Sequence, residues 1–237
     1  MSEEVSIQVN FGKPIPIFPL DSVSLLPQQV LPLHIFEPRY RQMVEAALDG
    51  SGQIAMATYA EEAAETPPLS QPPVRPAVCV GQIVQHEKLP DGRFNLLLQG
   101  VCRATILSES EPDEQRLFRE AMLEPAMDPD AEEAAEAMDN LRRWIEHNLE
   151  TGPLAHLAAA ESLLPYLRNE DVPSNAVLEL IAFALTTEGN IRYELLAESS
   201  AMARVAILRR DLDRLASTIA RAELQAKVKW PKGCSWN

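Results

Sequence analysis

Apolar residues in the first half of the chain fall into short blocks, a pattern typical of β-strands. Two blocks, Ile15–Leu20 and Val30–Phe36, are interrupted by Pro16, Pro19 and Pro32. Because proline has no N–H to donate to a sheet, both blocks suit edge strands or strand ends. Further strands are predicted at Gln53–Tyr59, Ala77–Leu89, Arg93–Leu107 and Arg116–Leu123. Together these segments predict a small, partly closed β-barrel or curled sheet.

A helix, two turns and a loop interrupt this series of strands. The helix is predicted after Glu37, with Pro38 in its first turn, where a missing N–H is tolerated. The sequence Pro90-Asp91-Gly92 predicts a tight turn, and Gly100 predicts a bulge or bend in the following strand. The stretch from Ala60 to Pro76 is rich in proline and is expected to form a mobile surface loop.

From about residue 126 the apolar spacing changes to the three-and-four pattern of helices. The helices are predicted at Ala131–Leu149, Pro153–Leu164, Asn175–Leu185, Asn190–Glu198 and Ala201–Lys227. An apolar seam on the last helix favours packing within the chain, with a dimer interface as the alternative. This seam consists of Val205, Leu208, Leu212, Leu215 and Ile219. The expected fold class is α+β: a β-rich pseudo-barrel with one helix over residues 1–125, then a helical bundle over 126–237 with a basic C-terminal helix and tail.

Two strings of sequence resemble a known family. FPLDSV…LPLHIFEPRYRQMV, within 18–44, and PDGRFNLLLQGVCRATI, over 90–106, are similar to the N-terminal substrate-binding domain of Lon proteases. The likeness is strongest to small bacterial proteins that carry this domain alone. The resemblance implies a PUA-like pseudo-barrel and binding of polypeptide rather than catalysis.

Composition narrows the possible environment and partners. With 46% apolar residues, the 237-residue chain can bury a sizeable core. No apolar run is long enough to span a bilayer, and the three cysteines form no CxxC pair, so we expect a soluble, cytoplasmic protein. The net charge of −14 argues against affinity for nucleic acid or anionic membranes. Residues 201–237 nevertheless hold eight Lys/Arg and three Asp/Glu. We expect this basic stretch to pack against an acidic body, with an anion-binding tail as the alternative.

The catalytic motifs of Lon proteases are not found in these 237 residues. The Gly-Lys pair, Gly12-Lys13, is followed by Pro14 and lacks the glycine that a phosphate-binding Walker A loop needs five residues earlier. The segment Pro231–Ser235 is weakly similar to the serine motif of the protease, but no lysine follows it to act as the base. The four histidines form no metal-ligand spacing, and His34 is interpreted as a structural residue. We therefore expect no enzymatic activity, no catalytic residues, no cofactor and no metal site.

The resemblance implies non-catalytic binding of unfolded or apolar polypeptide segments, and an apolar groove between barrel and helices is the expected place for it. Backbone groups at the proline-marked strand edges are possible pairing sites. Leu25 and Leu26 are the candidate peptide-binding residues: in a loop, they either fold back on the core or offer apolar surface to a partner. Family members often have Phe-Pro-Gly where this chain has Leu26-Pro27-Gln28, which changes the expected turn geometry. Phe36 and Tyr40 are expected to pack inward. The alternative function is an adaptor or scaffold that docks one folded partner; the oligomeric state is left open.

Overall fold

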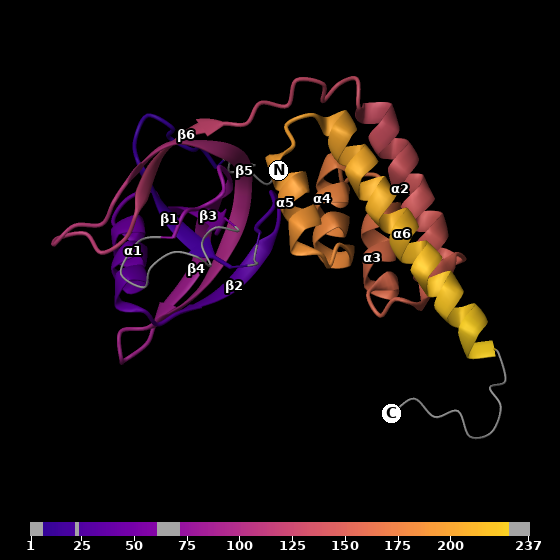
Figure 1. The fold of residues 1–237 in the computed structure, drawn as a ribbon, viewed down its shortest axis with the longest axis horizontal. Helices are drawn as coiled ribbons and strands as arrows, with labels where there is room; N and C mark the ends of the chain where they lie inside the picture. Colours follow the sequence, from indigo (N-terminus) through magenta and orange to yellow (C-terminus); the bar gives the residue numbers. More distant parts are fainter. Residues whose placement is uncertain (1–6, 22–23, 61–71, 228–237) are drawn as a thin grey trace.

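The computed structural model describes residues 7–21, 24–60 and 72–227. Figure 1 shows a β-barrel beside a bundle of helices. The strands are β1 (Ile15–Leu20), β2 (Val30–Ile35), β3 (Gln53–Thr58), β4 (Ala77–Lys88), β5 (Phe94–Ser110) and β6 (Glu120–Pro125). The helices are α1 (Pro38–Leu48), α2 (Ala135–Glu150), the short 3-10 helix η2 (Pro153–His156), α3 (Ala160–Arg168), α4 (Ser174–Leu185), α5 (Gly189–Ala197) and α6 (Ala201–Lys227). The α+β class is confirmed.

The long strand β5 organises the sheet. The strand order is β2-β5-β4-β3-β1-β6, and a further pairing of β6 with β5 closes the barrel. The first part of β5, over 94–99, pairs with β2, and its last part, over 104–110, pairs with β6. Strand β2 pairs with no described strand other than β5, so it is the edge strand that Pro32 predicted. The block with Pro16 and Pro19 was expected to be an edge strand or strand end in the same way, but it forms β1, which lies between β3 and β6.

Alternation of side chains along the strands produces two apolar clusters. In β3, Ile54 and Met56 belong to one cluster, whereas Ala55 and Ala57 belong to the other. The second cluster draws on β1, β3, β4, β5 and β6 and therefore fills the barrel. It contains mostly small or β-branched residues: Ile15, Ile17, Ala55, Ala57, Val78, Val80, Ala104, Ala121 and Leu123. A small barrel leaves room inside for side chains of this size.

The helix α1 covers part of the outer surface of the barrel. Its first residue is Pro38, as expected, and Tyr40 is buried with its ring 4.6 Å from that of Phe18. The prediction that Phe36 packs inward is wrong, because its side chain is 61% exposed. Phe36 follows the end of β2, where the alternation of the strand gives way to the start of α1. Glu37, at the start of the helix, pairs with Arg39 at 2.9 Å.

A single guanidinium group holds one corner of the helical bundle together. The side chain of Arg142, on α2, donates to the carbonyl oxygens of Tyr166, Leu167 and Asn169 at the end of α3 and to that of Val172. Carbonyls at a helix C-terminus have no partner within the helix, so a cation there satisfies them. The predicted helix over 153–164 is in fact split into η2 and α3, because the chain bends between them.

The apolar seam of α6 packs within the chain, as favoured. Leu208 and Leu212 are buried, and Val205, Leu215 and Ile219 pack against the same cluster. That cluster also contains residues of the barrel, so buried apolar contacts run continuously from one half of the molecule to the other.

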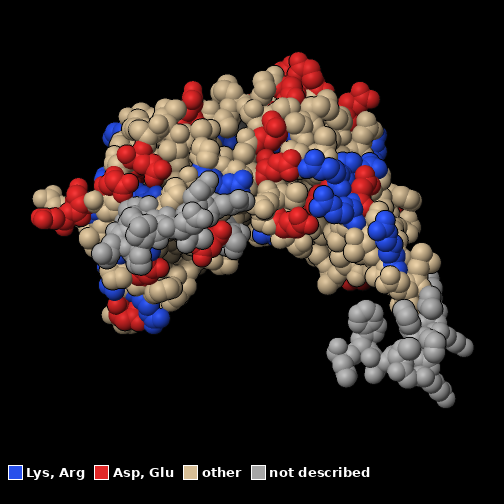
Figure 2. All heavy atoms as spheres, in the orientation of Figure 1, with Lys and Arg blue, Asp and Glu red and all other residues tan. Residues whose placement is uncertain are grey.

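Four arginines of α6 are paired with acidic residues, and three of those partners, Asp128, Glu188 and Glu194, lie outside α6, as the packing interpretation predicted. Arg210 pairs with Glu194 at 2.9 Å and Arg209 with Asp213 at 2.9 Å. Figure 2 shows Lys and Arg side chains of the helical half next to Asp and Glu side chains. Most of the predicted loop over 60–76, the motif over 231–235 and the last ten residues of the basic stretch lie outside the described residues.

Candidate functional site

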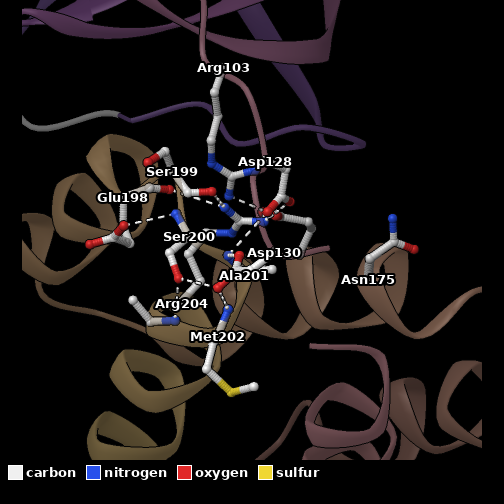
Figure 3. Close-up of polar contacts among 12 residues, drawn as sticks. Arg103, Asp128, Asp130, Asn175, Glu198, Ser199, Ser200, Ala201, Met202 and Arg204 are labelled. Carbon is white, nitrogen blue, oxygen red and sulfur yellow. Dashed lines mark hydrogen bonds and ion pairs between the residues drawn. The ribbon is translucent and has the colours of Figure 1, made fainter. Parts of the chain in front are cut away.

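A cleft of about 490 Å³ lies between the barrel and the helices. One wall comes from β5 and the β1–β2 connection, and the other from α2, α4 and the start of α6. Arg103 reaches into this region from the barrel, toward the linker after β6 and the turn between α5 and α6 (Figure 3). The cleft therefore lies where the sequence predicted a groove.

Arg103 joins the barrel to the bundle through a largely buried ion pair. Its Nη2 lies 2.6 Å from Oε1 of Glu179 on α4, and the two side chains are 11% and 14% exposed. The Nε atom of Arg103 also donates to the carbonyl oxygen of Leu195 on α5 at 3.2 Å. A buried charge is tolerated when a partner and further hydrogen bonds replace water, and both conditions are met here.

The linker between β6 and α2 holds the first turn of α6. Asp130 Oδ1 accepts a hydrogen bond from the Ala201 N–H at 2.7 Å, and its Oδ2 accepts one from the Ser200 hydroxyl at 2.6 Å (Figure 3). The hydrogen bond from Ser200 holds the pKa of Asp130 below its ordinary value. Asp128 pairs with Arg204 at 2.5 Å. Asp130 thus performs the capping role at a helix start, from a distant position in the sequence.

These pairings decide the chemistry of the cleft. The cations that line it, Arg103 and Arg204, each have an acidic partner, and Asp139 accepts a hydrogen bond from Ser174 at 2.6 Å. The walls of this cleft are as much polar as apolar, whereas a small neighbouring hollow, lined by Leu178, Leu195 and Leu208 among others, is mainly apolar. The apolar groove stays a prediction. The arginines of the cleft are paired with carboxylates, and the pair of Arg103 with Glu179 joins the two halves.

A second hollow, of about 360 Å³, lies over β2, β4 and β5. Strand alternation places Val30, Pro32 and His34 on one face of β2, and Leu97 lies opposite Pro32 on β5. Val30 is 46% exposed, Pro32 is exposed and Leu97 is half-buried. We call these three apolar residues, together with Phe36, the β2 patch. Exposed apolar residues gathered in this way on a sheet often mark a contact surface.

A row of polar side chains borders the β2 patch. His34 Nδ1 lies 2.7 Å from Asn95 Oδ1, and His34 Nε2 lies 3.2 Å from Arg93 Nη1. A guanidinium only donates, so in this contact Nε2 accepts from Arg93, which leaves Nδ1 to donate to the Asn95 side-chain oxygen. Arg93 pairs in turn with Asp91 at 2.6 Å. The structural interpretation of His34 agrees with this network. Within the network, the charges of Asp91 and Arg93 are paired with each other.

The candidate residues Leu25 and Leu26 fold back on the core. Their side chains are 1% and 0% exposed, so the first of the two alternatives describes this conformation. That they bind a polypeptide stays a prediction, and here their side chains offer no exposed surface for it. The loop is held closely: a Cβ added to Gly100 would lie 2.2 Å from the Leu26 carbonyl oxygen, so glycine is needed there.

The turn after Leu26 keeps its shape without a glycine. Gln28 has φ 67°, a left-handed conformation that glycine adopts more readily. Its N–H donates to the Gly100 carbonyl at 2.9 Å. The Gln29 side-chain amide accepts from the Leu26 N–H at 3.0 Å and thereby fixes the loop from inside. The departure from Phe-Pro-Gly is therefore accommodated by strain at one residue.

The cysteines are core residues, as predicted for Cys79 and Cys102. Cys79 is buried, and burial raises the pKa of its thiol. Burial also raises the pKa of the half-buried Cys102. Thiols with raised pKa values remain protonated at neutral pH and are poor nucleophiles. Cys234 lies outside the described residues. Among residues 7–21, 24–60 and 72–227, no group of His, Cys, Asp and Glu side chains is arranged to hold a metal ion.

Sequence reasoning found the edge strand but missed the inter-half contacts. The signal for the edge was proline inside an apolar block. The pairs of Arg103 with Glu179 and of Asp130 with the start of α6 join residues about 70 positions apart. No local pattern marks such pairs, because an isolated arginine or aspartate in a sequence looks like ordinary surface composition.

Comparison with known proteins agrees with this fold and with the two strings of sequence. Residues 14–214 match the model of the ATP-dependent protease La (LON) substrate-binding domain. The chain belongs to this family. It is 28% identical over 219 residues to a Lon protease of Desulfovibrio desulfuricans, and the aligned segment covers 91% of this chain and 23% of that protein. It is also 28% identical over 142 residues to the Lon protease of Escherichia coli K12, covering 59% of this chain and 18% of that protein.

Two solved structures share the fold of this Lon-family domain. The N-terminal domain of a Mycobacterium avium complex Lon protease superposes with a TM-score of 0.63 at 17% identity, covering 83% of this chain and 96% of that one. A Lon N-terminal domain protein from Xanthomonas campestris superposes with a TM-score of 0.55 at 18% identity, covering 84% and 98%. The chain spans about a quarter or less of the Lon proteases named above, and the part that it matches is their substrate-binding domain. No helix of the described residues is long and apolar enough to cross a bilayer.

Proposed function

We propose that this protein binds unfolded, apolar segments of polypeptide without catalysing a reaction on them. The observation that carries the proposal is the β2 patch, an exposed apolar surface beside a hollow of about 360 Å³. Membership of a family named for substrate binding supports the same class of ligand. The interaction takes place at the β2 patch, since the side chains of Leu25 and Leu26 are buried.

The physical driving force is the removal of apolar area from water. Val30 and Phe36 are 46% and 61% exposed, so both side chains have area left to bury. At about 25 cal/mol per Å² such contacts favour binding, but the ordering of a flexible peptide opposes it. We expect affinities of micromolar order, about −8 kcal/mol. The binding heat capacity should be negative, and added salt should weaken binding little, because the burial of apolar area drives the interaction.

The experiment is a titration of a fluorescently labelled, unstructured apolar peptide, followed by anisotropy. Phe36→Ser should weaken binding at least several-fold, because it removes the most exposed side chain of the β2 patch. Leu107→Ser is the matched control, since Leu107 is also an exposed apolar residue, 62% against 61%, but lies in the β5 segment that pairs with β6. Equal binding by both variants and the wild type would remove the patch from the proposal.

An adaptor that docks one folded partner is the other candidate function. The observation in its favour is the attachment of barrel to bundle through a largely buried ion pair and a shared apolar cluster, which gives the molecule a surface that extends across both halves. Capture from lysate followed by mass spectrometry distinguishes the two. Many unrelated sequences indicate binding of unfolded polypeptide, and one recurrent protein indicates an adaptor.

A further inference from the structure

The outer edge of β2 carries main-chain groups that no described strand pairs with. In an antiparallel ladder, residues that bond to the neighbouring strand alternate with residues whose N–H and C=O point away from it. Pro32 has no N–H, so it fits the position that points away from β5. Just before the strand, the Gly100 N–H donates to the Gln29 carbonyl at 2.8 Å, which places Gln29 at a position bonded to β5. Both observations give the same alternation between residues of β2 that bond to β5 and residues that point away from it.

This alternation identifies the groups on the open edge. Counting in steps of two from Gln29, the residues Leu31, Leu33 and Ile35 bond to β5 through their main chains. The main-chain groups of Val30, Pro32 and His34 therefore point outward. They offer carbonyl oxygens at all three positions and N–H donors at Val30 and His34. A row of this kind is complementary to the main chain of another extended segment.

The side chains beside this edge define what kind of segment would fit. Val30 and Pro32 lie on one face of β2, and Leu31 and Leu33, both half-buried, lie on the other. A strand added at the edge would thus place its alternate side chains next to apolar residues on either face. The nearby charges of Asp91 and Arg93, and of Glu37 and Arg39, are paired with each other. Glu87, which lines the hollow beside this edge, accepts a hydrogen bond from the Asn95 side-chain amide at 3.5 Å. The edge is therefore matched to an apolar segment without acidic side chains.

We propose that β2 takes up an extended polypeptide segment as an additional strand of the sheet. This inference rests on the proposed function and specifies how the polypeptide is held: by its main chain, in β conformation, with alternate apolar side chains against the β2 patch. A helix has its main-chain groups satisfied internally and cannot make these bonds. The ligand class is accordingly an unfolded or extended segment of about four to six residues, the length of a typical strand.

Two substitutions on β2 test the main-chain bonds directly. Pro32→Ala adds an outward N–H and should tighten binding of the labelled apolar peptide by about two- to tenfold, the worth of one net hydrogen bond. His34→Pro removes an outward N–H without removing a bond to β5, and should weaken binding by a similar factor. His34→Ala is its matched control, since it removes the same imidazole contacts but keeps the N–H. Thermal melting verifies that each variant is folded.

The peptide supplies an independent test. Two versions are made, one N-methylated at odd positions and one at even positions, so that one version loses the N–H groups that face β2 and the other does not. Strand addition predicts that one version loses at least tenfold in affinity and the other binds like the parent peptide. On binding of the parent, the amides of Val30 and His34 should also become protected from hydrogen exchange.

The remaining outcomes separate the inference from the proposed function. Binding of both methylated peptides as tightly as the parent, with the Phe36→Ser effect intact, overturns strand addition and leaves polypeptide binding at the patch in place. Absence of binding by the parent peptide overturns both. If Pro32→Ala sediments as a dimer and binds no peptide, the edge pairs with a second copy of the chain, and the inference is wrong about its occupant.

Discussion

The cleft between the two halves and the open edge of β2 differ in how their polar groups are satisfied. In the cleft, Arg103, Arg204 and Asp128 each have partners within the chain. At β2, the main-chain groups of the outer edge have none among the described strands, and apolar side chains beside them are exposed. Charged side chains that pair with one another stabilise the contact between the two halves. Unpaired main-chain groups next to exposed apolar side chains are instead available to bind a partner. Of these two hollows, the larger one, the cleft between barrel and bundle, therefore has a structural role.

The largest effect should come from breaking the buried ion pair of the cleft. Arg103→Ala leaves the carboxylate of Glu179 buried without its cation, and should lower the free energy of unfolding by about 3–5 kcal/mol. Urea denaturation measures this loss. The double variant Arg103→Met with Glu179→Leu is the control, and should recover most of the stability because no charge is left unpaired. A single variant as stable as the wild type would show that the pair does not hold the halves together.

The next largest effect is the difference in stability loss between truncation of Leu26 and truncation of Phe36. Leu26→Ala should cost about 2–5 kcal/mol, because it opens a cavity in the core. Phe36→Ala should change stability by less than about 0.5 kcal/mol, since its side chain is mostly in water. Both are measured by the same denaturation experiment. A large loss for Phe36→Ala would mean that this ring is packed, and would remove it from the β2 patch.

A smaller effect is expected at Asp130, and it should depend on pH. The folded-state pKa of Asp130 is lowered, mainly by the hydrogen bond from Ser200, so its contribution to stability is complete above the unfolded pKa of about 4. The contribution is lost as the pH falls through the folded pKa. Asp130→Ala should therefore lower the melting temperature at pH 7, and the difference from wild type should shrink toward pH 3. A difference that is the same at both pH values would contradict the capping role.

The smallest effect concerns Gln28, which lies at the mouth of the cleft and just before β2. Gln28→Gly relieves the left-handed backbone strain but makes the unfolded chain more flexible, so the net gain should be at most about 1 kcal/mol. Gln29→Gly is the matched control. It removes a buried side-chain amide that accepts from the Leu26 N–H, and should therefore destabilise the protein. Calorimetric melting of the two variants compares them. Destabilisation by Gln28→Gly would show that its side chain contributes more than the strain costs.

Much of the fold could be read from short-range patterns. Short apolar blocks located the strands, three-and-four spacing located the helices, and Pro32 marked the edge strand because a missing N–H is a local property. The same signal gave no edge at β1, where Pro16 and Pro19 lie in a strand between β3 and β6. The ends of elements were less accurate: β6 begins at Glu120 rather than Arg116, and α2 begins at Ala135 rather than Ala131. Phe36 was misplaced because it is apolar and adjoins a strand, yet the strand ends one residue earlier.

The candidate site depended more on tertiary structure. The loop leucines could be buried or exposed on sequence grounds alone, and only the packing of the loop against Gly100 and the core decided that Leu25 and Leu26 are buried. The polar character of the cleft was likewise invisible, since it arises from side chains that the sequence separates widely.

The sequence by itself determined the class of the fold, the family and the edge character of β2, because each depends on residues close together in the chain. The tertiary structure decided which hollow is filled by satisfied charges and which edge remains open. Those outcomes depend on distances between residues such as Arg103 and Glu179, and folding brings such residues together through the burial of apolar surface rather than through any signal that they carry themselves.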